Sequence, residues 1–218
     1  MKNLGLLLLP ILAITLMLGG NAFAQNVGDN SVYFVTYYSN ANTSGAPDAT
    51  LRIVYDDDES TFFGGGETAG YIAAAIYVFD DSQEMRSCCA CALYANQMLS
   101  ESVNKQLTAN EFTGRGQIAR GVIKVISSYS DDPAYVTPLP GLRGWMTHIQ
   151  VTSTTFPSGA GNDANAVEKG PWFVTEDALA HSNLTALEES NLEALCSYGL
   201  TIGSGYGWCP CTLEDYDF

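Results

Sequence analysis

Along much of the chain, hydrophobic and polar positions follow the patterns typical of β-strands. Five segments are rich in β-branched and aromatic residues: 31–39 (SVYFVTYYS), 50–56 (TLRIVYD), 70–80 (GYIAAAIYVFD), 120–128 (RGVIKVISS) and 144–153 (GWMTHIQVTS). Clusters of Gly, Pro, Asn and Asp separate them, as turns between strands would. Because strands follow one another without intervening helices, we expect antiparallel sheets that close as a sandwich or a barrel.

The distribution of apolar residues differs between two of these segments. In 50–56, Leu51 and Ile53 lie on the opposite side from Arg52, which predicts a strand near the rim of its sheet. Segment 70–80 is apolar on both sides, which predicts a central strand covered on both faces.

One helix is predicted near the C-terminal end, in the segment NLTALEESNLEALCSYG. Thr185 and Glu188 have the spacing of a capping box, and Gly199 stands where a left-handed C-cap would end the helix. A shorter helical turn is expected at 175–182 (TEDALAHS). The predicted fold class is therefore mainly β: an antiparallel β-sandwich, or a barrel-like variant, with one or two short C-terminal helices.

The N-terminal segment has the layout of a secretory signal peptide. Lys2 is followed by the apolar run 4–18 and by the small-residue pattern AFA just before Gln25. A membrane anchor is the alternative, but Pro and Gly interrupt the run and it is shorter than the ~20 residues that span a bilayer. We expect a signal peptide at 1–24 and a single β-rich domain at 25–218, secreted or periplasmic and associated with the cell surface.

The chain is strongly acidic, with 24 acidic against 9 basic residues and a formal net charge of −15. Such a surface repels phosphate backbones and anionic headgroups, which argues against nucleic acid as a partner. No later apolar stretch predicts membrane insertion. Cations, neutral glycans and basic proteins remain as ligand classes, and the charge could also serve solubility alone.

Six cysteines follow the predicted signal peptide, in two clusters: Cys88, Cys89, Cys91, Cys196, Cys209 and Cys211. An even number of cysteines in an exported chain indicates disulfides. Bonds within a cluster are disfavoured, because adjacent cysteines form a strained ring and the geometry of C-x-C does not favour a local bond. Three bonds between the clusters leave six pairings open, and a local Cys88–Cys91 bond with two longer ones is the main competitor.

A thiolate metal site is the functional rival of this disulfide interpretation, because the clusters offer more soft ligands than zinc or an iron–sulfur centre needs. Paired C-x-x-C knuckles are missing, however, and an exported chain meets an oxidising environment. The context of a redox-active C-x-x-C is missing as well. We therefore interpret the clusters as a disulfide framework.

A weak calcium motif lies in the acidic segment 56–67 (DDDESTFFGGGE). Asp56, Asp58, Ser60 and Glu67 match positions 1, 3, 5 and 12 of an EF-hand loop, but Thr61 replaces the glycine of position 6 and the flanks resemble strands. The hypothesis is a calcium site that is not an EF-hand, and the alternative is a solvated hairpin loop. The pairs Asp80-Asp81 and Asp131-Asp132 are weaker candidates of the same kind, and no other cofactor is indicated.

Catalytic motifs are scarce. The histidines, His148 and His181, stand without a metal-ligand spacing or a G-x-S-x-G elbow, so a structural role is the simpler interpretation. A glycosidase-like pair of carboxylates depends on distance in space rather than on sequence spacing.

The chain resembles a group of uncharacterised secreted bacterial proteins that are β-rich and carry mid-chain and C-terminal cysteine clusters. The resemblance rests on IYVFD (76–80), CCAC (88–91), GVIKVISS (121–128) and the glycine-rich end GSGYGWCPC (203–211). It implies an exported bacterial protein and no catalytic residue.

Two functions are therefore expected from the sequence. The first is a non-enzymatic extracellular protein, either a structural subunit or a binding module of the cell surface. Strand 31–39 lies close to the new N-terminus and could add to the sheet of a second copy, or be a strand of its own domain. The alternative function is a secreted carboxylate-dependent hydrolase acting on glycans.

Overall fold

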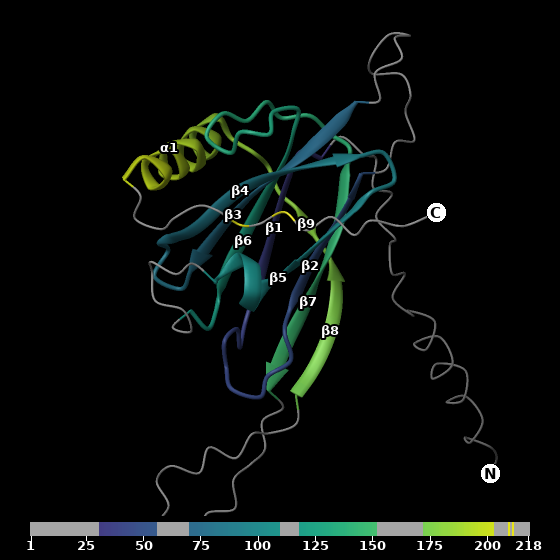
Figure 1. Ribbon diagram of the computed structural model, residues 1–218, viewed down its shortest axis with the longest axis vertical. Helices are drawn as coiled ribbons and strands as arrows, with labels where there is room; N and C mark the ends of the chain where they lie inside the picture. Colours follow the sequence, from purple (N-terminus) through teal and green to yellow (C-terminus); the bar gives the residue numbers. More distant parts are fainter. Residues whose placement is uncertain are drawn as a thin grey trace, which may run out of the picture.

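Two antiparallel β-sheets and a C-terminal helix make up the fold (Figure 1). The structure, a computed structural model, describes residues 31–55, 70–109, 118–151, 172–202, 209 and 211. Strands account for 50% and helix for 16% of it, which confirms the mainly β prediction.

Sheet A has the strand order β4-β3-β6-β1-β9, and sheet B has the order β5-β2-β7-β8. The strands are β1 (Tyr33–Tyr38), β2 (Thr50–Tyr55), β3 (Tyr71–Asp80), β4 (Met85–Tyr94), β5 (Met98–Ser102), β6 (Gly121–Ser128), β7 (Leu142–Val151), β8 (Trp172–Ala178) and β9 (Ala180–His181). A π-helical turn, η1 (Val103–Leu107), follows β5. The five segments predicted as strands are β1, β2, β3, β6 and β7, and every pairing between the named strands is antiparallel.

The main hydrophobic core lies between the two sheets. Leu51 and Ile53 of β2 are fully buried in it, together with Ile76 of β3 and Met146 of β7. The apolar residues of β2 therefore alternate because one face of the strand packs on the core, as predicted. Its expected place near the rim is wrong, because β2 lies between β5 and β7.

A second, smaller core lies on the outer face of sheet A. Tyr77 of β3 and Ile126 of β6 pack there with Leu192 and Cys196 of the helix α1 (Ala186–Ile202), which lies over this face (Figure 1). Strand β3 is thus buried on both faces, as its continuous apolar pattern predicted. The resulting order of layers is α1, sheet A, sheet B.

The N-cap of α1 is as predicted, and its end is not. The Thr185 hydroxyl accepts a hydrogen bond from the backbone N–H of Glu188 at 3.1 Å, so Thr185 is the N-cap. Gly199 does not end the helix, which continues to Ile202. The predicted helical turn at 175–182 is also wrong, because this segment belongs to β8 and β9. An isolated helix of two turns is marginal, and pairing with β7 and β1 satisfies the backbone instead.

The chain crosses from sheet B to sheet A at Leu179, between β8 and β9. The Leu179 N–H donates to the carbonyl of Gly144 at 2.9 Å, and β9 then pairs with β1. A side chain at Gly144 would prevent this approach, since its Cβ would lie 2.5 Å from the carbonyl oxygen of Arg52 and 2.8 Å from Leu179 Cδ1. The crossing closes one side of the sandwich in a barrel-like manner.

Candidate functional site

All six cysteines are paired, and each bond joins the two clusters. The bonds are Cys88–Cys196, Cys89–Cys209 and Cys91–Cys211, with Cα–Cα distances of 5.9, 5.5 and 5.4 Å. The disulfide interpretation is confirmed, and neither the local Cys88–Cys91 bond nor a thiolate metal site is present. Three disulfides indicate an oxidising, non-cytoplasmic environment.

Strand alternation explains why the neighbouring cysteines do not bond to each other. They lie in β4, where successive side chains point to opposite faces of sheet A. Cys88 faces α1, while Cys89 and Cys91 face the core between the sheets. Strand β4 was not predicted, because its sequence MRSCCACALY carries few β-branched or aromatic residues.

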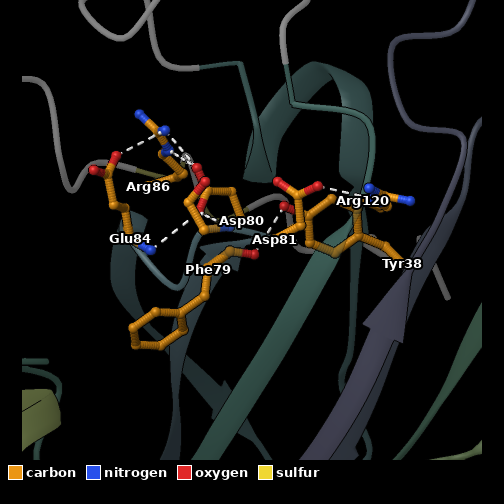
Figure 2. A network of polar contacts seen from close by, with 8 residues as sticks. Tyr38, Phe79, Asp80, Asp81, Glu84, Arg86 and Arg120 are labelled. Atoms are coloured by element: carbon orange, nitrogen blue, oxygen red, sulfur yellow. Dashed lines mark hydrogen bonds and ion pairs between the residues drawn. The ribbon is translucent and has the colours of Figure 1, made fainter.

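The carboxylate of Asp80 serves the turn between β3 and β4 (Figure 2). It accepts hydrogen bonds from the backbone N–H groups of Ser82 (2.9 Å) and Glu84 (3.0 Å) and from the guanidinium of Arg86. Burial alone would raise the pKa of Asp80, but these hydrogen bonds outweigh it and hold the pKa below its usual value. Such a carboxylate stays ionised and is poorly suited to act as a general acid near neutral pH.

Asp81 and the neighbouring strand end complete this polar network. Asp81 pairs with Arg120 at 2.8 Å, and the Tyr38 hydroxyl donates to the carbonyl of Phe79 at 3.0 Å (Figure 2). Each of these contacts joins strand ends of sheet A. The network therefore has a structural role: it holds the β3–β4 turn and the strand ends together.

The calcium candidates Asp56, Asp58, Ser60 and Glu67 lie outside the described residues, so the calcium hypothesis stays a prediction. Within the part of the chain that the structure describes, no group of three or more His, Cys, Asp or Glu side chains could hold a metal ion. No helix among those residues is long and apolar enough to cross a membrane.

The histidines lie where the chain passes from sheet B to sheet A: His148 is in β7, which pairs with β8, and His181 is in β9. His148 is 3% exposed, its ring stacks on Tyr37 at 4.1 Å, and its Nε2 lies 3.7 Å from the carboxylate of Asp177. Burial lowers the pKa of His148, although Asp177 opposes the shift. His181 lies against the ring of Phe34 at 5.1 Å. Both histidines thus contact an aromatic ring of β1, as structural residues do.

The segment 31–39 contains β1, which pairs with β6 over its whole length and with β9 at Phe34 and Val35. This corresponds to the alternative in which 31–39 is a strand of its own domain. Self-association through it stays a prediction.

Three tyrosines gather on the surface at the end of sheet A that lies opposite the Asp80 network. Tyr71 and Tyr94 are direct cross-strand partners at the ends of β3 and β4, and Tyr129 follows the end of β6. The ring of Tyr71 lies 6.2 Å from that of Tyr94, inclined by 59°, and 6.2 Å from that of Tyr129, inclined by only 13°. We call Tyr71, Tyr94 and Tyr129 the tyrosine cluster.

Two tyrosines of the cluster are exposed, and a carboxylate acts on the third. Tyr94 and Tyr129 are 49% and 50% exposed. Asp131, two residues after Tyr129, is the main cause of a raised pKa of Tyr71, and burial and the other two phenols add to it. Sequence reasoning missed this cluster, since only the register of β3 with β4 and β6 brings positions 71, 94 and 129 together.

No protein-family model, curated protein or solved structure matches this chain. The functional argument therefore rests on the fold and on the tyrosine cluster.

Proposed function

We propose that the chain is an exported, extracellular binding module whose ligand contacts the tyrosine cluster. One observation carries the proposal: two half-exposed tyrosines are in ring contact with a third, and the charge of an aspartate acts on that third tyrosine. Large aromatic side chains that gather on a surface are typical of binding sites, because each offers a rigid apolar face and a polar hydroxyl.

The surrounding framework supports a preformed site. Tyr94 ends β4, the strand that carries three disulfides, and Tyr71 begins β3, which is buried on both faces. A ligand contacting these rings would meet side chains already fixed by rigid strands, so little conformational entropy would be lost on binding. The secretory signal predicted at 1–24 would bring this surface outside the cell.

A binding panel tests the proposal. The purified mature chain is titrated with soluble neutral glycans, basic peptides and small organic cations, using isothermal calorimetry. The double variant Tyr94→Ala/Tyr129→Ala removes the exposed rings, and Tyr198→Ala removes an exposed tyrosine of α1 outside the cluster as a control. Circular dichroism and the melting temperature establish that all the variants fold.

The expected result is a ligand that wild type and Tyr198→Ala bind alike and that the double variant binds at least about tenfold more weakly, as for a binding hot spot. Equal binding by all three proteins, or no binding to any member of the panel, would overturn the proposal.

The other expected roles stay separate proposals. Self-association through strand 31–39 predicts dimers or larger species in sedimentation experiments at rising concentration. If the chain is a glycan hydrolase, it should release reducing ends from the glycans of the same panel. Substitution of the carboxylates that catalyse the reaction should abolish that release.

A further inference from the structure

We propose that the tyrosine cluster and Asp131 bind an organic cation, an alkylammonium or quaternary ammonium group. This inference deepens the proposed function and rests on it.

The rings supply the first part of such a site. Tyr71 is in contact with two rings of different orientation, one nearly parallel to it and one steeply inclined. The cluster therefore presents aromatic faces in more than one direction. The negative face of an aromatic ring attracts a cation within about 6 Å of the ring centre, and sets of such faces recognise quaternary ammonium groups.

Asp131 supplies the second part. It is exposed, and no described residue donates a hydrogen bond to its carboxylate or forms an ion pair with it. Its neighbour Asp132 differs, since its carboxylate accepts a hydrogen bond from the backbone N–H of Ala134 at 2.9 Å and so serves the local turn. The charge of Asp131, which lies two residues after Tyr129 along the chain and acts on the phenol of Tyr71, is thus available to a ligand.

Charge decides between the ligand classes. The ion pairs of the described residues hold basic side chains against carboxylates of the same chain, as in Arg52–Glu176 and Lys124–Glu188. The chain as a whole carries a net charge of −15. An anionic ligand would be repelled by this field, and a neutral glycan could donate hydroxyl hydrogen bonds to Asp131 but would gain nothing from the field itself. A cation gains from the rings, from Asp131 and from the field together.

Choline and its neutral isostere 3,3-dimethylbutan-1-ol provide the sharpest test, because they share a shape and differ in charge. Each is titrated into wild type and into the variants Asp131→Asn, Tyr94→Phe and Tyr94→Leu, with Nα-acetyl-lysine amide as a primary ammonium probe. Calorimetry or tyrosine fluorescence gives the dissociation constants at low and at physiological salt.

We expect wild type to bind choline about tenfold more tightly than the isostere, on the scale of a partly desolvated cation–π contact. Asp131→Asn should weaken choline binding severalfold and reduce its salt dependence. Tyr94→Phe keeps the aromatic face and should therefore lose much less of the binding than Tyr94→Leu, which should lose most of it. A lysine derivative that binds as well as choline would place primary ammonium groups in the ligand class, and weaker binding would restrict the class to quaternary ones.

Equal affinities for choline and the isostere would overturn the inference, as would no binding of either cation. If a glycan of the panel then binds through Tyr94 and Tyr129, the proposed function stands and only the cation is wrong. If no ligand depends on these tyrosines, both fail.

Discussion

Removal of the Cys88–Cys196 bond by the double substitution Cys88→Ala/Cys196→Ala should destabilise the fold by an amount that depends on the other two bonds. Considered alone, the bond has a sequence separation of 108 residues, which corresponds to about 4.7 kcal/mol in the chain-entropy estimate. The bond Cys89–Cys209 already closes nearly the same loop, however. The path from Cys88 through that bond and back along the chain to Cys196 is only about 15 residues, which corresponds to about 3 kcal/mol.

Guanidinium denaturation of the oxidised proteins measures this loss, and peptide mapping establishes that the remaining cysteines keep their partners. The control is Cys91→Ala/Cys211→Ala. Cys91 and Cys211 each lie two residues after a cysteine of the Cys89–Cys209 bond, so their bond closes an extra loop of only a few residues. Its loss should be the smaller one, about 2 kcal/mol or less. Losses of about 4.7 kcal/mol in both variants would refute the nested-loop reasoning, and so would no loss in the first.

Further predictions concern packing, pH and calcium. Gly121→Ala should destabilise by about 1–3 kcal/mol in urea denaturation, because its Cβ would overlap the carbonyl oxygen of Phe79 and lie 2.6 Å from the Tyr38 hydroxyl; an unchanged midpoint would contradict this. Since burial lowers the pKa of His148, folding favours the neutral ring, and stability should fall as the pH drops below about 6.5. The melting temperature of wild type should therefore fall more steeply from pH 7 to pH 5 than that of His148→Gln, and parallel curves would count against it. If segment 56–67 binds calcium, EDTA should lower the melting temperature, and an unchanged value would remove the calcium hypothesis.

The strands that could be predicted from sequence are those whose own residues carry the signal. β1, β3 and β6 are β-branched or aromatic over at least half of their length, and the burial of β3 on both faces follows from its continuous apolar pattern. β4 lacks that signal because much of it is cysteine and alanine. Part of the β8 sequence has the pattern of a helical turn, but the segment forms a strand because it pairs with β7. In both cases pairing with a neighbouring strand, rather than local propensity, determines that the segment is a strand.

The disulfides and the tyrosine cluster show the same division. The cysteine clusters predicted bonds between them, but the choice among six pairings needed the alternation of β4, which places Cys88 and Cys89 on opposite faces. The tyrosine cluster gave no signal in the sequence. Its members are separated by 23 and 35 residues along the chain, and only the strand register makes them neighbours.

The most direct test of the proposed ligand surface is an aromatic ¹H–¹³C NMR titration of the mature chain with choline. We predict shifts that saturate with choline and are confined to the rings of Tyr71, Tyr94 and Tyr129, while the exposed rings of Tyr135 and Tyr198 stay unchanged. Uniform small shifts on every exposed tyrosine, or no shifts in the cluster, would contradict the assignment of this surface as a cation site.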